Sequence, residues 1–342
     1  MPTDPTPSKT LILTRSQVEG LVAMAEVIEA VEAAHADMAR GTAAQPSPGA
    51  MALPSGPGAF LTMTALADRQ GLAAAKLLAD IPDNASRGLP SQRSVLMLVS
   101  QETGFCEGII HGQIPTRIRT AAASAVATRH LARPDSRVLG LIGAGDLAVA
   151  HVAALAQVRP FERLVFWTRN PDTATRFAAR IAQAHPGLAV AALATPAAVF
   201  AEADVVCTLT PSREPVVEGA WFRPGQHVNA VGAPPRADHR EIDAAGMARA
   251  RVFLDSRETA FHESGDLLLA IAEGALSASD VGPEIGPEIG AVVTGAAPGR
   301  TAPEDITLYN SVGIAMQDIA IGALLLARAR AAGVGIEIDL AG

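Results

Sequence analysis

A glycine-rich turn between an apolar strand and a helix constrains this chain more than any other feature. The run Val138–Ile142 is typical of a strand that is covered on both faces, and Gly143, Ala144, Gly145, Asp146 and Leu147 follow it directly. They begin a G-x-G-x-x-A pattern, in which the first glycine permits the turn and the second lets a pyrophosphate approach the backbone. Free N–H groups at the helix start would face the phosphates. These five residues are therefore predicted to bind a dinucleotide, and the alternative is a strand–helix turn without a phosphate.

The residues after the next predicted strand indicate which dinucleotide is preferred. A site for NAD usually has an Asp or Glu about 20 residues past the glycines, where its carboxylate binds the ribose 2′-OH. Here the strand 164–167 is followed by Thr168, Arg169 and Asn170. An arginine without a competing carboxylate suits the 2′-phosphate of NADP, and the alternative is an ordinary surface arginine. NADP(H) is thus favoured over NAD(H), and these three residues join the predicted cofactor site.

Strands and helices alternate from residue 138 to about residue 255. This alternation predicts an α/β fold with a Rossmann-type, doubly wound parallel sheet, whose ligands bind at the carboxyl ends of the strands. Thr208, Thr210, Val231 and Gly232 come at two of these ends and are predicted to bind the cofactor. The later strands are expected at 164–167, 188–192, 204–209, 227–231 and 251–254, with helices at 174–184 and near 197–201.

The N-terminal part of the chain predicts a smaller α+β domain. Apolar residues follow a helical period from 14 to 40, as one helix or a helix pair, and a Gly/Pro-rich loop is expected from 41 to 58. Apolar runs of strand type follow at 60–66, 72–78, 95–100 and, after a turn, 104–110. A long apolar helix is expected near the C-terminus, from 311 to 328.

Two basic residues lie where a cation needs an explanation. Lys76 interrupts the otherwise apolar run 72–78, so it either extends to the surface or faces a polar pocket. Arg119, together with Arg117, falls in the first turn of a predicted helix at 118–132, where the helix dipole disfavours a cation unless an anion is near. That anion is either a substrate carboxylate or a neighbouring Asp or Glu.

Composition excludes several classes of partner. The formal net charge is −8 and no cluster of Lys and Arg occurs, so nucleic acid and anionic membranes are not expected as partners. The two cysteines lie far apart without metal-ligand spacing, so no metal is expected. Gln317 and Asp318 interrupt the most apolar stretch, and the N-terminus lacks the pattern of a signal peptide. A cytoplasmic protein is expected.

Several segments together resemble the ornithine cyclodeaminase/μ-crystallin family over nearly the whole chain. No single segment would be specific, but their order and spacing are. They are Lys76, Gly88-Leu-Pro90, Arg119-Thr-Ala-Ala122, Leu141-Ile-Gly-Ala-Gly145, Thr208-Leu-Thr-Pro-Ser212, Gly225-Gln-His-Val-Asn-Ala-Val-Gly232, Ser264-Gly-Asp-Leu267 and Ser311-Val-Gly-Ile-Ala315.

The resemblance implies a homodimer with two domains in each chain. One comprises residues 1–118 with 312–342 and binds substrate and the second subunit, and the other, residues 119–311, binds the dinucleotide. The active site is expected between these domains. Ser311 and Gly313 are expected to bind the cofactor. Arg119 is expected to bind the substrate carboxylate, and Lys76 to polarise or protonate the reacting carbon–nitrogen unit.

Departures from the family pattern separate the possible activities. Cyclodeaminases have an Asp where this chain has Pro234, and Asp238, four residues later, is the candidate replacement. The family's usual arginine near residues 46–48 is also missing. The resemblance therefore implies an NAD(P)H-dependent reductase of a ketimine or cyclic imino acid, or a related amino acid dehydrogenase. The alternatives are an ornithine cyclodeaminase with bound NAD and a crystallin-like protein that binds NADPH without turnover.

Overall fold

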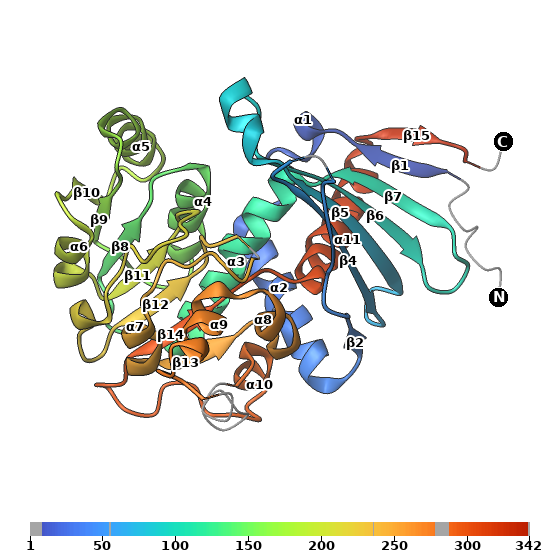
Figure 1. The fold of residues 1–342 in the computed structure, drawn as a ribbon. Helices are drawn as coiled ribbons and strands as arrows, with labels where there is room; N and C mark the ends of the chain where they lie inside the picture. The colour runs from blue at the N-terminus through green and yellow to red at the C-terminus, as the bar shows by residue number, and fades with distance from the viewer. Residues whose placement is uncertain (1–8, 55, 235, 278–286, 341–342) are drawn as a thin grey trace. The chain divides into compact units, whose positions relative to one another are not determined.

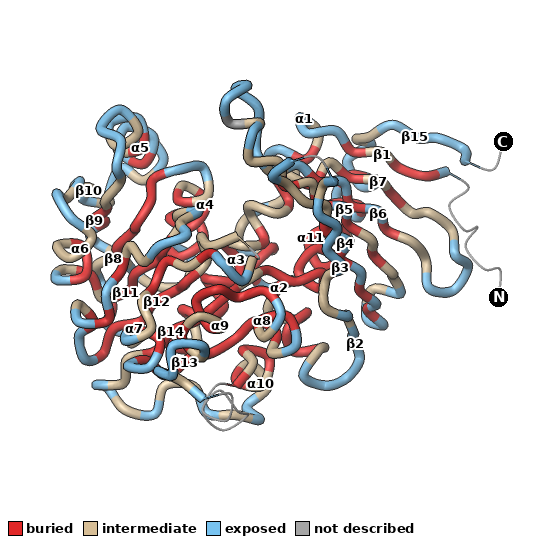
Figure 2. The backbone as a smooth tube through the Cα atoms, viewed as in Figure 1, coloured by how far each residue is buried: buried red, intermediate tan, exposed pale blue. Residues whose placement is uncertain are grey.

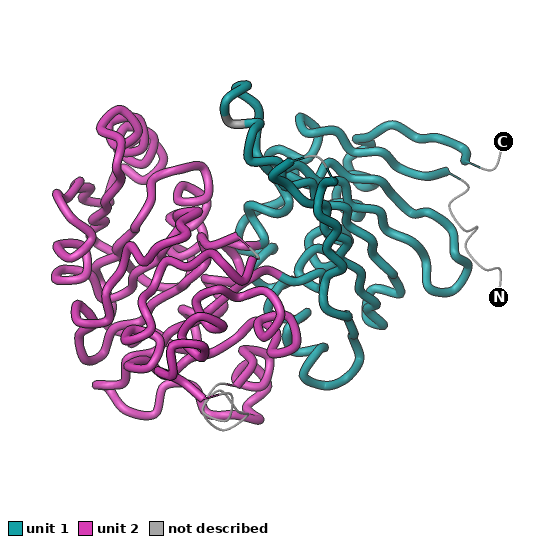
Figure 3. Tube along the Cα trace, viewed as in Figure 1, with its two compact units in different colours: residues 1–119, 314–342 teal, residues 120–313 magenta. Residues whose placement is uncertain are grey.

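The computed structural model describes residues 9–54, 56–234, 236–277 and 287–340 (Figure 1). The chain divides into two compact units (Figure 3). Unit 1 comprises residues 1–119 and 314–342, and unit 2 comprises residues 120–313. The first division falls within helix α3 (Gln113–Leu131).

Unit 1 is an eight-stranded, mostly antiparallel sheet in the order β15-β1-β7-β6-β5-β4-β2, with β3 paired to β4. Helix α11 packs on β4, β5 and β6 and on helix α2. The strands are β1 (Thr10–Leu13), β2 (Ala43–Ala44), β3 (Gly49–Ala52), β4 (Ala59–Ala67), β5 (Leu72–Asp80), β6 (Gln92–Ser100), β7 (Cys106–His111) and β15 (Ile336–Ile338). The helices are α1 (Arg15–Val18), α2 (Met24–Arg40), η1 (Pro82–Arg87) and α11 (Ala315–Ala332).

Alternation along the strands decides which face of this sheet the helix covers. In β4 the side chains of Leu61, Met63 and Ala65 are buried, whereas those between them are exposed. Gly322 permits the close approach of α11, because a Cβ atom there would lie 2.8 Å from Leu98 Cδ1. The core of unit 1 therefore lies between α11 and one face of the sheet.

The structure confirms one sequence expectation in unit 1 and corrects two. The segment 14–40 is a helix pair, one of the two forms expected. The expected loop at 41–58 contains strands β2 and β3, which form because they pair with β4. Helix α3 begins at Gln113, five residues earlier than expected, so Arg117 and Arg119 lie past its first turn. The argument from the helix dipole was therefore wrong for both arginines.

Unit 2 is a seven-stranded parallel sheet in the order β10-β9-β8-β11-β12-β14-β13. This is the predicted Rossmann-type α/β fold. The strands are β8 (Val138–Ile142), β9 (Arg163–Trp167), β10 (Ala189–Ala192), β11 (Val205–Thr208), β12 (His227–Ala230), β13 (Arg251–Leu254) and β14 (Thr307–Asn310). The helices wholly within unit 2 are α4 (Asp146–Leu155), α5 (Pro171–Ala184), α6 (Pro196–Glu202), η2 (Gly219–Trp221), α7 (Ala244–Arg249), α8 (Arg257–Glu263), α9 (Gly265–Ala272) and α10 (Ile289–Val293).

The central strands β8, β11 and β12 are buried on both faces (Figure 2), as the largely apolar sequences of β8 and β11 predict. Strand β14 was not predicted, and the C-terminal helix begins at Ala315 rather than at 311. The strand order reverses between β8 and β11. Strands β9 and β10 extend the sheet on one side of β8, and the later strands extend it on the other side. Ligands of such sheets bind at this point, beyond the carboxyl ends of the strands. In the described part of the chain, no helix has both the length and the apolar character that crossing a membrane requires.

Candidate functional site

The glycine turn after β8 has the shape that a dinucleotide requires. Gly143 has a φ of +109°, which L side chains rarely adopt, and a Cβ atom there would lie 2.9 Å from the carbonyl oxygen of Leu209. Its N–H donates to the carbonyl oxygen of Trp167 at 2.9 Å. Gly145 is the N-cap of α4 and has open space where a side chain would stand. A pyrophosphate could therefore approach the backbone at Gly145, and the residues present fit the predicted cofactor.

The first turn of α4 also carries charges that act on a bound phosphate. Asp146 is exposed at the helix start, where its carboxylate would repel a phosphate. Arg180 of α5 offsets this charge through an ion pair of 2.7 Å with Asp146. Ala144 is buried and Leu147 is half-buried, so these two residues shape the turn through packing and backbone.

The three residues after β9 have different surroundings. The Asn170 side chain caps α5, since its oxygen accepts the N–H groups of Asp172 and Thr173 at 2.9 and 3.2 Å. Arg169 is exposed, and no ion pair joins it to another described residue. Thr168, which directly precedes Arg169, is half-buried. The guanidinium of Arg169 is thus available for an anion beside the second strand of the fold.

The ends of β11 and β12 are held by a residue that was not predicted. Glu241, which is fully buried, accepts hydrogen bonds from the hydroxyl of Thr208 and from both the hydroxyl and the backbone of Thr210. It also accepts from the N–H of Gly232, and Val231 N–H donates to Thr208 O at 3.2 Å. Three predicted cofactor residues, Thr208, Thr210 and Gly232, therefore meet at one carboxylate. Burial raises the pKa of Glu241 to about 7, whereas hydrogen bonds from Thr210 and Thr208 lower it.

A second buried carboxylate orders the segment after β14. Asp255 Oδ2 accepts the hydroxyl of Ser311 at 3.0 Å and the N–H of Gly313 at 2.7 Å. Gly313 has a φ of +82°, so a glycine suits this bend. The structure places Ser311 and Gly313 beyond the carboxyl end of a unit 2 strand, as it does the other predicted cofactor residues.

Unit 1 contains a buried polar cluster around Lys76. The Lys76 ammonium donates to Thr116 Oγ1 at 2.8 Å and to the two carboxylate oxygens of Asp318 at 3.2 and 3.1 Å. Arg119 Nε donates to the same carboxylate at 3.1 Å, and Arg119 Nη1 donates to Gln317 Oε1 at 2.9 Å. Lys76, Arg119 and Asp318 are all at least 95% buried. Of the two alternatives for Lys76, the structure therefore supports a polar pocket.

This cluster holds two cations against one carboxylate. Burial lowers the pKa of Lys76 to about 8, an effect that Asp318 opposes and Arg119 adds to. His35 contacts the cluster through Gln317 at 3.1 Å, and burial with the charge of Arg119 lowers its pKa to about 4. His35 is therefore neutral near pH 7 and adds no third cation. Such a site attracts an anion and has an ammonium that can release a proton near neutral pH.

Asp318 and Gln317 were not predicted as site residues, although the sequence contains a signal for them. They are adjacent polar residues in an otherwise apolar stretch, and both are buried in α11. Two buried polar side chains in one helical turn require partners, which here are Arg119, Lys76 and His35. The sequence signal reveals that partners exist but does not identify them.

Asp238, the third predicted catalytic residue, lies at the surface of unit 2. Its side chain is 67% exposed and accepts a hydrogen bond of 2.8 Å from His239 Nδ1. That bond lowers the pKa of Asp238, and His239 Nε2 lies 3.4 Å from Arg213 Nε. The catalytic role of Asp238 stays a prediction.

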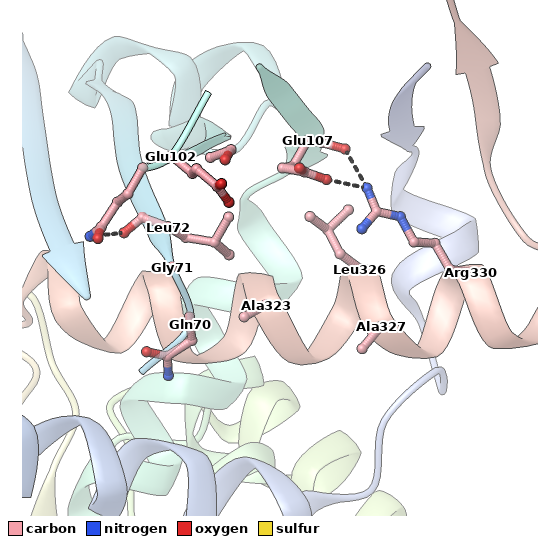
Figure 4. A pocket seen from close by; sticks show the side chains of 11 residues that line it. Gln70, Gly71, Leu72, Glu102, Glu107, Ala323, Leu326, Ala327 and Arg330 are labelled. Atoms are coloured by element: carbon pink, nitrogen blue, oxygen red, sulfur yellow. Dashed lines mark hydrogen bonds and ion pairs between the residues drawn. The ribbon is translucent and has the colours of Figure 1, made fainter. Parts of the chain in front are cut away.

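A cavity of about 730 Å³ in unit 1 contains none of the predicted site residues (Figure 4). It is bordered by the turns before β5 and after β6 and by the C-terminal half of α11. Arg330 and Glu107 form an ion pair at its edge, and Leu326 lines its wall (Figure 4). The Lys76 cluster is a separate feature of the same unit.

The chain is similar to known proteins over nearly its whole length. The profile of the ornithine cyclodeaminase/mu-crystallin family matches residues 8–333. A Delta(1)-pyrroline-2-carboxylate reductase of Paracoccus denitrificans is 38% identical over 73% of this chain and 78% of its own.

Two solved structures are similar to nearly the whole chain. One is the Thermococcus litoralis Delta(1)-pyrroline-2-carboxylate reductase in complex with NADH and L-proline, with a TM-score of 0.92, 32% identity, and 96% and 100% of the two chains covered. The other is an archaeal alanine dehydrogenase dimer with bound NAD, with a TM-score of 0.90, 31% identity, and 97% and 99% covered. This chain belongs to the ornithine cyclodeaminase/mu-crystallin family.

Proposed function

We propose that this protein is an NAD(P)H-dependent reductase that converts a cyclic 2-imino acid, such as 1-pyrroline-2-carboxylate or 1-piperideine-2-carboxylate, into the amino acid. The observation that carries the proposal is the buried Lys76 ammonium, which shares the Asp318 carboxylate with Arg119. Relatives named as reductases of this substrate, and a relative solved with NADH and L-proline, support the same reaction.

Different residues bind the substrate and transfer the proton. The Arg119 guanidinium binds the substrate carboxylate, and Asp318 holds the guanidinium in position. A reduced nicotinamide cofactor, when bound, would supply the hydride for the imine carbon. Lys76 donates a proton to the imine nitrogen, so the C=N double bond becomes a C–N single bond and an amine forms. Because burial lowers the pKa of Lys76 to about 8, the ammonium is present at pH 7 and still acidic enough to donate.

The cofactor is proposed to bind along the carboxyl edge of the unit 2 sheet. Gly143 and Gly145 would hold the pyrophosphate, while Thr210, Gly232 and Ser311 line later strand ends. Arg169 favours NADP(H), because the described residues contribute no ion pair to its guanidinium and no carboxylate follows β9 directly.

We also propose that the protein is a homodimer. The face of the unit 1 sheet opposite α11 exposes Leu66, Leu77, Val95 and Met97, each 39 to 51% exposed. Leu77 and Val95 are directly paired across β5 and β6. Contiguous exposed apolar side chains of this kind mark protein interfaces, and a second copy of the chain is the occupant that the dimeric relative supports.

Cyclodeamination of ornithine is the second candidate, because the family includes it. That reaction needs a carboxylate to manage the protons of the departing amino group. Pro234 cannot supply one, and the Asp238 carboxylate is engaged with His239. Oxidation of NADPH and NADH with a panel of imino and oxo acids, with and without amines, tests the proposed reductase. Binding of NADPH without turnover of any of them would instead indicate a crystallin-like binding protein.

A further inference from the structure

Glu241 is a buried carboxylate of unit 2 that takes no part in the proposed binding and proton transfer. It is fully buried, and no Lys, Arg or His of the described residues forms an ion pair with it. A buried carboxylate costs several kcal/mol in desolvation unless hydrogen bonds offset the cost. The hydrogen-bond donors that surround Glu241 therefore indicate its function.

All four hydrogen bonds to Glu241 come from the ends of two strands. Oε1 accepts the N–H of Thr210 at 2.6 Å and its hydroxyl at 2.7 Å. Oε2 accepts the hydroxyl of Thr208 at 2.7 Å and the N–H of Gly232 at 2.7 Å. Both oxygens thus have two donors, and only an ionised carboxylate can accept from all four without reorienting a donor.

The strand ends that Glu241 joins are packed without spare room. A Cβ atom at Gly232 would lie 2.1 Å from the nitrogen of Thr210. On the other side of the same segment, a Cβ atom at Gly143 would lie 2.9 Å from the carbonyl oxygen of Leu209. The peptide between Leu209 and Thr210 therefore lies between the dinucleotide turn and the end of β12, and Glu241 fixes it.

A second carboxylate holds Glu241 in place. Asp266, at the start of α9, accepts the backbone N–H groups of Glu241 and Ile242 at 2.9 and 3.0 Å. The side chain of Glu241 therefore projects from an anchored backbone. Asp266 of α9 therefore sets the position of Glu241.

We propose that Glu241 is a positioning residue that sets the spacing of the β8, β11 and β12 ends and thereby the geometry of the dinucleotide site. The inference rests on the proposed cofactor role of this edge. Glu241→Gln tests it, because the amide oxygen can replace one carboxylate oxygen, whereas the amide NH₂ would face two donors. Glu263→Gln is the matched control, since Glu263 is also a buried glutamate of unit 2 but makes no hydrogen bond to these strand ends.

The experiment measures dissociation constants for NADPH and NADH by fluorescence at 15 °C, together with kcat, the KM for the imino acid and the Tm. Glu241→Gln is expected to weaken binding of the preferred dinucleotide at least tenfold and to lower kcat, while the KM for the imino acid changes less than twofold. Glu263→Gln should leave dinucleotide binding, kcat and the KM for the imino acid unchanged. A purely structural role would lower the Tm and leave the dissociation constant of the folded protein as in the wild type, and that result would overturn the inference.

Two further outcomes are separable. If Glu241→Gln does not fold, Thr208→Val decides, because it removes one donor to Glu241 from a fully buried side chain of similar shape. It should weaken dinucleotide binding at least threefold, and unchanged binding would reject the positioning role. If the wild type binds neither dinucleotide, the proposed function fails instead. Normal binding by the wild type and by both variants rejects only the role of Glu241.

Discussion

Lys76 and Asp318 are 242 residues apart in the sequence, and their charged groups lie 3.1 Å apart in the interior of unit 1. Asp318 also binds Arg119 at 3.1 Å, so one carboxylate orients the two cations that the proposed reaction uses. A buried pair of this kind contributes little net stability, because desolvation offsets the attraction. Its value here is that it keeps an ammonium and a guanidinium together in a buried site.

Lys76→Met should abolish most turnover and leave dinucleotide binding intact. The variant removes the proton donor, which corresponds to about a 100-fold or greater loss of kcat, whereas Arg119 still pairs with Asp318 and preserves the fold. Lys9→Met, at the only other lysine and on the surface, is the control. Steady-state kinetics and NADPH titration check both. Loss of cofactor binding in Lys76→Met would show that Lys76 is structural.

The rate of imine reduction should fall as the pH rises above about 8. Burial lowers the pKa of Lys76 to about 8, so the ammonium that donates the proton is lost above that value. The decrease should approach about tenfold for each pH unit. Oxidation of the amino acid needs the neutral amine and should show the opposite trend, rising up to about pH 8. The pH profiles of kcat for imine reduction and for amino acid oxidation check this prediction. Two profiles with the same pH dependence would contradict it.

Arg169→Asp should reverse the cofactor preference. The wild type is expected to bind NADPH more tightly than NADH, because Arg169 meets the 2′-phosphate that an aspartate would repel. Arg163→Asp, at the opposite end of β9, makes the same change in net charge and should leave the preference unchanged. Titration of each variant with NADPH and with NADH gives the ratio of the two dissociation constants. A wild-type preference for NADH of tenfold, about 1.4 kcal/mol, would contradict the assignment.

Leu77→Glu should convert the proposed dimer into monomers. Leu77 is about half exposed at the centre of the apolar face of β4 to β6, where a charge would be buried without a partner on association. Leu340→Glu alters a similarly exposed leucine beyond β15 and should leave the dimer intact. Sedimentation equilibrium distinguishes the species. A dimeric Leu77→Glu variant would place the interface elsewhere.

The fold was predictable where burial alone determines it. Strands β8 and β11 of unit 2 are short, largely apolar runs, and such runs form strands covered on both faces. Strand β14 was not predicted, and its place in the sheet depends on pairing with β12 and β13. Strands β2 and β3 lie in Gly/Pro-rich sequence and exist because β4 supplies a partner.

The candidate site was predictable only in part, because contacts between residues far apart in the sequence leave no local signal. Lys76 was identified as a charge in an apolar run, a local signal, whereas Arg119 was identified from a helix start that lies five residues earlier in the structure. Their shared partner Asp318 comes from the far end of the chain, and only the folded structure reveals the contact. Glu241 lies in a polar loop, where nothing in the sequence separates it from its neighbours.

The central claim is that the protein reduces a ready-made imine and does not deaminate ornithine. The most direct measurement incubates the purified protein separately with 1-pyrroline-2-carboxylate and with L-ornithine, and records NADPH oxidation, proline and ammonia. The imino acid should be reduced with one NADPH oxidised for each proline formed, and ornithine supplied with NAD should yield little proline or ammonia. Catalytic formation of proline and ammonia from ornithine, with no net change in cofactor, would contradict the account and make Asp238 the candidate carboxylate, which Asp238→Asn would then test.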